Sequence, residues 1–166
     1  VDPNPAVEDL EYVSREQGLE QADVLICAMD LTPHNHGYFD DDAWSRVRPG
    51  SFFVNISRGE LSPSGPLLTA LDRDILAGVA LDVFDAESVL SVALRRGETS
   101  SNDPRVQPSL ELADRPDVIC TPHNAFNTLE SVERKSADSA RQLQHLLEHD
   151  TFLWPVPEFA ATPENA

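Results

Sequence analysis

The sequence predicts an α/β fold with a parallel sheet, because short apolar runs alternate with segments of helical character. Three of these runs have the length and the Val and Ile content of buried parallel strands. They are SFFVNIS (51–57), AGVALDVF (77–84) and DVICTP (117–122). An ionisable residue follows each run: Arg58, Glu87 and His123. Since ligands of open α/β sheets bind beyond the carboxyl ends of the strands, we expect these three side chains to converge at one edge.

The first part of the chain predicts further elements of the same kind. Residues 9–22 predict a short strand followed by a helix, and ADVLICAMD (22–30) predicts the next strand. A turn with proline and glycine covers residues 31–39. The segment DDDAWSRVRPG (40–50) predicts a short helix, acidic at its start and basic near its end.

The second part predicts two helices separated by an irregular segment. Residues 66–76 predict a helix with Pro66 at its first position. Residues 88–116 are polar and rich in turn formers, so we expect a solvent-exposed insertion with one or two helical turns. Residues 128–149 predict the longest helix, with Thr128 as its N-cap.

This alternation predicts a doubly wound, Rossmann-like parallel sheet with helices on both faces, incomplete at its N-terminal end. The glycine-rich turn G-x-G-x-x-G that opens a dinucleotide fold does not occur. The opening VDPNP resembles the end of the second strand of such a fold, which puts Asp2 where a ribose-binding carboxylate stands. We predict a partial dinucleotide-binding domain over 1–150 and an extended tail over 151–166.

Composition excludes some classes of function. The 166 residues are 40% hydrophobic, so we expect a globular chain with a real core. The net charge of −17 argues against nucleic-acid binding, which needs a basic surface. No apolar run has the length of a membrane span, and the first residues do not form a signal peptide. A cytoplasmic location without membrane contact is therefore expected. Acidic excess fits either a high-salt cytoplasm or a GC-rich genome.

Cysteine and histidine placement does not predict a metal site. Cys27 and Cys120 both fall within apolar runs and are expected to be small buried hydrophobic residues. His145 and His149 are four residues apart on the last helix without an evident third ligand, so we interpret them as a surface pair.

Four segments resemble a known family along nearly the whole chain. In order, VRPGSFFVNISRGEL, LAGVALDVFDAES and DRPDVICTPHNAFNT resemble signatures of the NAD-binding domain of D-isomer-specific 2-hydroxyacid dehydrogenases. The segment ADVLICAMDLTPHNHGYF resembles the strand and turn near the nicotinamide ribose. AF-x-T after His123, and the long gap from Glu87 to His123, are most similar to the D-lactate dehydrogenase branch. Because the family's glycine-rich turn and substrate domain are missing, an N-terminally truncated portion is expected.

The resemblance implies a reaction and a role for each of the three ionisable residues. The family transfers a hydride between NAD(H) and a small 2-oxo or 2-hydroxy acid. Arg58 would bind the substrate carboxylate, for which its planar fork of donors is suited. His123 would supply or remove the proton, and Glu87 would hydrogen-bond its other ring nitrogen and fix the tautomer.

The resemblance also implies a set of cofactor-binding positions. Asp82 matches the acceptor for the nicotinamide amide, and Asp30 replaces a proline that is usual near the cofactor, where an added carboxylate would weaken binding. The full set is Asp2, Met29, Asp30, Asn35, Ile56, Ser57 and Asp82.

Two other interpretations stay open from the sequence. The chain could be a non-catalytic, NAD-responsive interaction module, or an inactive truncated gene product. Relatives dimerise through this domain, so a homodimer is expected. The identity of the 2-hydroxy acid and the choice between NAD and NADP are not determined by these motifs.

Overall fold

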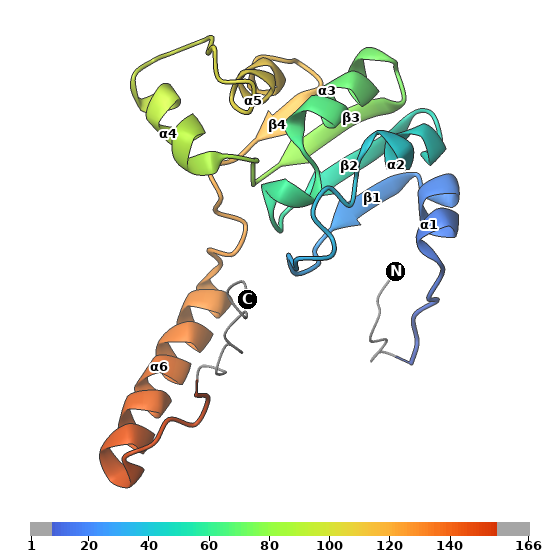
Figure 1. Cartoon of the computed structure of the whole chain (residues 1–166). Helices are drawn as coiled ribbons and strands as arrows, with labels where there is room; N and C mark the ends of the chain where they lie inside the picture. Colours follow the sequence, from blue (N-terminus) through green and yellow to red (C-terminus); the bar gives the residue numbers. More distant parts are fainter. Residues whose placement is uncertain (1–7, 156–166) are drawn as a thin grey trace, which may run out of the picture. The chain divides into compact units, whose positions relative to one another are not determined.

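A computed structural model describes residues 8–155 of the chain (Figure 1). Along the sequence, the chain divides into two units after Ala125. The first unit holds the sheet and five α-helices, and the second holds one long helix. Asp2, the predicted ribose-binding carboxylate, lies outside the described residues. The predicted limits 1–150 and 151–166 stay predictions.

The predicted parallel sheet is confirmed. It has four strands in the order β1-β2-β3-β4, and every neighbouring pair is parallel. The strands are β1 Val24–Cys27, β2 Ser51–Asn55, β3 Leu76–Leu81 and β4 Val118–Cys120. Each strand is followed by a helical segment before the next one begins, which is the connection that parallel strands require. The carboxyl ends of all four strands therefore lie along one edge.

The helices fall between these strands. They are α1 Arg15–Gln21, α2 Asp41–Arg46, α3 Ser64–Asp72, α4 Glu87–Arg95, α5 Gln107–Ala113 and α6 Leu129–His149, with a short 3₁₀ turn η1 at Gly59–Leu61. Side-chain caps start several of them. Ser14 and Gln17 form a capping box at α1, and the Asp40 carboxylate accepts the N–H of Ala43 at α2. The predicted Thr128 cap of α6 is confirmed by its hydrogen bond from the N–H of Ser131.

A predicted strand is missing and a predicted helix starts earlier than expected. No strand forms before α1 among the described residues, so β1 is an edge strand of the described sheet. Helix α3 begins at Ser64 rather than at Pro66, which therefore lies inside the first turn. Proline is tolerated there because the first N–H groups of a helix have no helical acceptor.

The insertion at 88–116 is more ordered than its composition predicts. It contains most of α4 and all of α5, and four of its apolar side chains are buried in a small core of their own: Leu90, Ala93, Val106 and Leu110. Phe84 packs against this core and also against the main core beneath the sheet. The expectation of a solvent-exposed insertion is therefore wrong for these residues.

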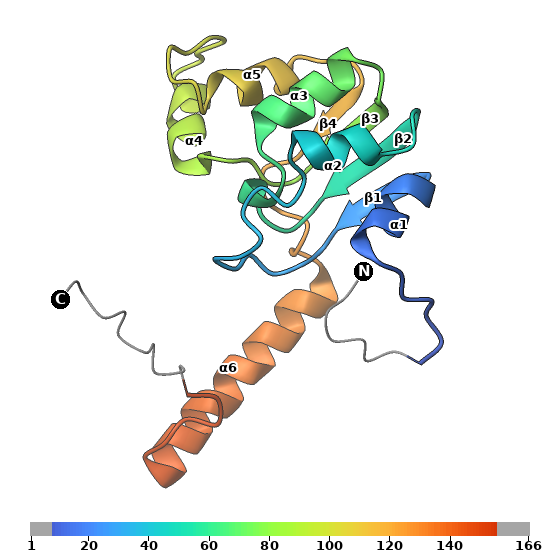
Figure 2. The same cartoon turned by 45° about the vertical axis from the view of Figure 1, so that its right-hand side comes forward.

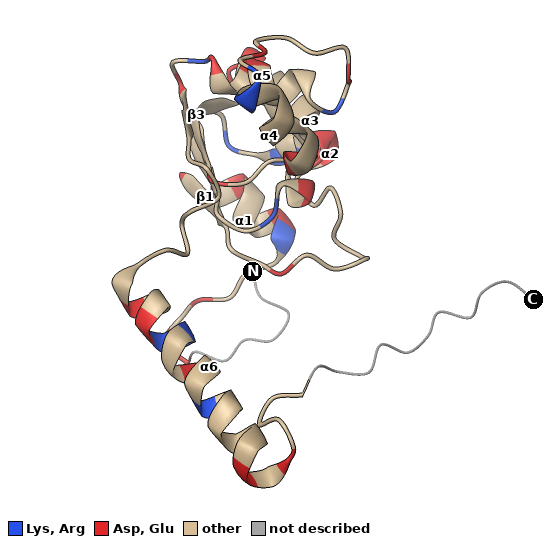
Figure 3. Cartoon of the chain, turned by 90° about the vertical axis from the view of Figure 1, so that its left-hand side faces the viewer, with Lys and Arg blue, Asp and Glu red and all other residues tan. Residues whose placement is uncertain are grey.

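The described residues of the first unit cover only one of the two faces of the sheet. Helices on both faces were expected from the sequence. Figure 2 shows α2, α3 and α5 in front of the strands, and Figure 3 shows the helices of this unit on one side of the sheet. On that side Cys27 and Phe53 are fully buried. On the other side Ile26 is 63% exposed and Phe52 is 50% exposed.

The main core is closed by aromatic packing between α2 and β2. Trp44 meets Phe53 edge to face at 5.0 Å between ring centroids and stacks on Phe39 at 5.3 Å. Trp44 is only 2% exposed, so it is a packing residue.

The second unit is helix α6 with a segment that returns along it. The Gln142 side chain accepts the N–H of Leu153 at 2.8 Å and donates to the carbonyl of Trp154 at 3.2 Å. The Arg141 guanidinium lies 5.3 Å from the Trp154 ring centroid. No side chain of α6 is buried, although it carries exposed leucines. Within residues 8–155, no helix combines the length and apolar character needed to cross a membrane.

Candidate functional site

Glu87 and His123 meet at the carboxyl edge of the sheet. Glu87 is the first residue of α4, shortly after β3, and His123 lies in the loop after β4. The Nδ1 atom of His123 lies 2.9 Å from Oε2 of Glu87. The other carboxylate oxygen, Oε1, accepts the backbone N–H of Phe84 at 3.0 Å. Both oxygens of Glu87 are thus engaged, and the carboxylate is fixed relative to the imidazole.

Asp82 holds the loop that carries His123. Its carboxylate accepts the Thr121 hydroxyl at 2.5 Å, the N–H of Asn124 at 2.8 Å and the N–H of Ala125 at 2.7 Å. Burial would raise the pKa of Asp82, but these three donors and the nearby His123 outweigh it and hold the pKa below its ordinary value. The carboxylate is therefore ionised at neutral pH, and the loop on both sides of His123 is bound to it.

The backbone at the site includes two left-handed residues that are not glycine. His123 has φ 52° and Ala86, next to Glu87, has φ 56°. Each such conformation costs on the order of 1–3 kcal/mol and persists only where neighbouring contacts maintain it. The hydrogen bonds of Asp82 and Glu87 are contacts of that kind.

Arg58 lies at the same edge of the sheet but is less constrained. Its side chain is exposed and donates to the carbonyl of Ser57 at 2.8 Å. Among residues 8–155, no hydrogen bond or ion pair links it to Asp82, Glu87 or His123. The structure therefore brings two of the three predicted residues into contact and leaves the arginine side chain at the surface.

The backbone of the loop that carries Arg58 is nevertheless held by hydrogen bonds. The buried amide of Asn55 donates to the carbonyl of Arg58 at 3.0 Å and to the Ser62 hydroxyl at 2.7 Å, and accepts the N–H of Ser57. Gly59 follows, and a Cβ atom there would overlap the backbone of Phe84 and Asp85. Only glycine permits the loops after β2 and β3 to pack this closely.

Five of the predicted cofactor-binding residues occupy the loops after β1 and β2: Met29, Asp30, Asn35, Ile56 and Ser57. The Ser57 hydroxyl donates to the carbonyl of Met29, which joins the two loops. Asn35 closes the following turn, donating to the carbonyl of Asp30 at 2.8 Å and accepting the N–H of Thr32 at 2.7 Å. Ile56 exposes 46% of its surface. Their role in cofactor binding stays a prediction.

Sequence reasoning did not single out Asn55 or Thr121, whose hydrogen bonds hold the loops that carry Arg58 and His123. A buried asparagine within the apolar run SFFVNIS was an available signal, because a buried amide requires partners. The hydrogen bond of Thr121 to Asp82 depends on three-dimensional proximity and left no such signal.

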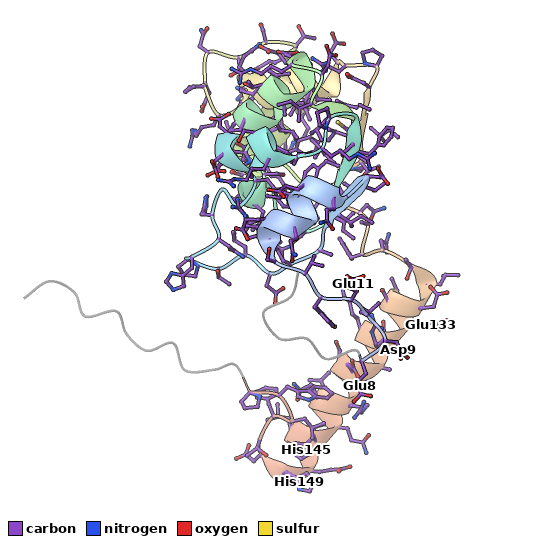
Figure 4. The ribbon with its side chains drawn as sticks, turned by 90° about the vertical axis from the view of Figure 1, so that its right-hand side faces the viewer. Glu8, Asp9, Glu11, Glu133, His145 and His149 are labelled. Carbon is purple, nitrogen blue, oxygen red and sulfur yellow. The ribbon has the colours of Figure 1, made fainter. Side chains whose placement is uncertain are left out.

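The two cysteines and the histidine pair of α6 were also assigned from the sequence. Cys27 is buried as predicted, whereas Cys120 is exposed, because β4 is an edge strand of the described sheet. Figure 4 shows His145 and His149 near the end of α6, where their ring centroids lie 4.5 Å apart. Within residues 8–155, no group of three His, Cys, Asp or Glu side chains is arranged to hold a metal ion.

The arrangement is suited to proton transfer. Since Glu87 engages Nδ1 of His123, proton exchange with a ligand would use Nε2. At this edge of the sheet, an imidazole oriented by a carboxylate can exchange a proton with an oxygen, and a surface guanidinium can bind an anion.

Comparison with protein families gives one match. Residues 1–125 match the model of the D-isomer specific 2-hydroxyacid dehydrogenase, NAD binding domain. Among curated proteins, the D-lactate dehydrogenase of Streptococcus agalactiae serotype V (strain ATCC BAA-611 / 2603 V/R) is 34% identical over 125 residues, or 75% of this chain. The D-lactate/D-glycerate dehydrogenase of Pediococcus acidilactici is 33% identical over 132 residues. This chain spans 37% and 39% of the lengths of these two relatives.

Solved structures show the same likeness. The structure of D-2-hydroxyisocaproate dehydrogenase superposes with a TM-score of 0.81 at 27% identity, covering 93% of this chain and 47% of that one. The D-lactate dehydrogenase of Aquifex aeolicus, complexed with NAD and lactic acid, has a TM-score of 0.74 at 26% identity, covering 88% of this chain and 45% of that one.

Proposed function

Because the chain belongs to the D-isomer specific 2-hydroxyacid dehydrogenase family, as its NAD-binding domain, we propose that it serves an oxidoreductase acting on D-2-hydroxy acids and 2-oxo acids. The observation that carries this proposal is the contact between Nδ1 of His123 and Oε2 of Glu87 at 2.9 Å. The whole reaction is assigned to the full-length gene product, since the chain spans about 40% of its curated relatives.

The three ionisable residues have distinct roles in this proposal. His123 gives a proton from Nε2 to the substrate oxygen during reduction and takes it back during oxidation. Glu87 positions the imidazole and stabilises its charged form. Arg58 binds the substrate carboxylate and stabilises negative charge on the neighbouring oxygen. The exposed position of the Arg58 side chain supports this role, because the guanidinium can turn towards a ligand.

The residues present fit the nicotinamide end of the cofactor. NAD, when bound, accepts or donates the hydride. The half-exposed apolar side chain of Ile56 offers a surface for a ring, and the Asp82 carboxylate has three acceptor positions in use out of about four. Met29, Asp30, Asn35 and Ser57 complete this set. The sequence contains no glycine-rich phosphate turn.

The test is an activity assay of the full-length gene product. NADH oxidation is followed with pyruvate and with bulkier 2-oxo acids, and D-2-hydroxy acids are the expected products. His123→Asn should lower kcat by roughly 10²–10⁴-fold, the usual contribution of general acid–base catalysis. His149→Asn, on exposed α6, is the matched control and should retain activity.

The same assay decides between the proposal and its alternatives. If no 2-oxo acid is turned over by a folded full-length product, the dehydrogenase proposal is wrong. An interaction module would then show NAD-dependent complex formation without turnover. Light scattering of the same sample tests the predicted homodimer.

A further inference from the structure

The Asp85 carboxylate joins three parts of the domain. Its Oδ1 atom accepts the N–H of Ser64 at 3.3 Å and also the Ser64 hydroxyl. The Ser109 hydroxyl lies 2.8 Å from the Ser64 hydroxyl and 3.4 Å from the same Asp85 oxygen. Ser64 and Ser109 are buried, at 2% and 0% exposure. One carboxylate oxygen therefore connects the loop after β3 to the first turn of α3 and to α5.

The residue before Asp85 fixes Glu87 directly. The N–H of Phe84 donates to Oε1 of Glu87 at 3.0 Å, while Oε2 contacts His123. The Phe84 ring packs against both the main core and the small core of the insertion. A shift of Phe84 would therefore move the N–H that holds the Glu87 carboxylate, and with it the group that orients the imidazole.

The residue after Asp85 needs external support. Ala86 is left-handed, with φ 56°, and has no glycine-like freedom to adopt that conformation cheaply. The methyl side chain of Ala86 makes no capping hydrogen bond to α4. The left-handed conformation must therefore be maintained by the contacts of neighbouring residues. On one side this neighbour is Asp85, held by Ser64 and Ser109.

The loop that carries Arg58 packs closely against the peptide bond between Phe84 and Asp85. A Cβ atom on Gly59 would overlap the Phe84 carbonyl and the Asp85 nitrogen, so the two backbones are in direct contact. Asp85 therefore lies where the Arg58 loop, the Glu87 loop and the insertion meet.

We propose that Asp85 is a positioning residue that holds Glu87 against His123, with Ser64 and Ser109 as its anchors. The proposal deepens the proposed function, on which its catalytic meaning rests. It makes α5 part of the support of the site, although α5 belongs to a segment that is polar and turn-rich in sequence.

The direct readout is the tautomer of His123 in the 166-residue chain. Two-bond ¹⁵N–¹H correlation spectra at alkaline pH report which ring nitrogen holds the proton, and His123→Asn assigns the signals. A carboxylate at Nδ1 stabilises the Nδ1–H tautomer. The wild-type chain should show that tautomer, and Glu87→Ala should lose it.

Asp85→Ala should lose most of the Nδ1–H signal, as Glu87→Ala does. Asp85→Asn keeps an acceptor oxygen for Ser64 and should retain it. Asp114→Ala, an exposed aspartate at the end of α5, is the matched control and should leave the tautomer unchanged. A structural role alone would lower the unfolding midpoint of Asp85→Ala without changing the tautomer.

Two smaller changes keep the test decisive if Asp85→Ala does not fold. Ser64→Ala and Ser109→Ala each remove one anchor, and both should reduce the Nδ1–H signal, Ser64→Ala more strongly. A wild-type tautomer in folded Asp85→Ala, or in both serine variants, would overturn the proposal. The spectra require neither cofactor nor substrate, so a failed dehydrogenase assay leaves this result independent.

Discussion

The two halves of the candidate site differ in how firmly they are held. His123 and Glu87 contact each other at 2.9 Å, and Asp82 binds the loop around His123 with three hydrogen bonds. The exposed Arg58 side chain donates a hydrogen bond to the neighbouring carbonyl of Ser57. The group that would move a proton is therefore pre-organised within this chain, whereas the group that would bind an anion gains its partners only with a ligand.

The largest effect is expected from a substitution at Gly59, where the Arg58 loop packs against the loop that precedes Glu87. Gly59→Ala should destabilise the chain by about 3 kcal/mol or more, because its Cβ would overlap the backbone of Phe84 and Asp85. Urea unfolding followed by the fluorescence of buried Trp44 measures this. Gly65→Ala is the matched control, since a Cβ there meets nothing within 4 Å, and should be stabilising. Equal stability of the two variants would contradict the close approach.

The next effect is specific to the proton-transfer half. Asp82→Asn should cost about 2 kcal/mol at neutral pH, because the three donors lose a charged acceptor. The pKa of Asp82 is lower in the folded chain than its ordinary 3.8, so the stabilisation is complete above 3.8 and is lost as the pH falls through the lower folded value. Urea unfolding at a series of pH values should show the difference from wild type shrinking in that acid range. A constant difference would mean that charge is not the cause.

A smaller change removes one of the three hydrogen-bond donors to the Asp82 carboxylate. Thr121→Val keeps the shape of the side chain and removes the hydroxyl that donates to Asp82 at 2.5 Å. The expected cost is about 1 kcal/mol by the same unfolding measurement. Thr99→Val, at an exposed position, should change stability by no more than about 0.5 kcal/mol. If Thr121→Val lowers the free energy of unfolding no more than Thr99→Val does, the hydroxyl donor to Asp82 does not contribute to stability.

The smallest effect on stability is expected at Arg58. Arg58→Ala should change the free energy of unfolding by no more than about 0.5 kcal/mol, because the side chain is exposed. In the full-length product the same change should lower kcat/KM for a 2-oxo acid by roughly 100-fold, the value of a charge-assisted contact. A large loss of stability would instead make Arg58 a structural residue and remove the contrast between the two halves.

The four strands of the sheet were predictable because their apolar runs are continuous and bounded by turn residues, and the Thr128 cap follows a local rule. The short strand expected before α1 did not form, because propensity alone does not supply a pairing partner. The core of the insertion was not predictable, since Leu90 and Val106 are separated by a polar, turn-rich stretch that hides their contact. In the site, motif order placed Glu87 and His123 at one edge. Local sequence could not reveal that the Asp82 carboxylate would bind the loop of a strand far away in the chain.

One face of the sheet is left uncovered by the described residues of the first unit, and this has a practical consequence for purification. Ile26, Phe52 and Ile119 present apolar surface on a parallel sheet, and such sheets are ordinarily covered on both faces. A preparation of these 166 residues should therefore bind hydrophobic dyes and adsorb to apolar chromatography resins more strongly than its acidic composition suggests. Screening with mild detergent, and concentration only late in the procedure, follow directly from that surface.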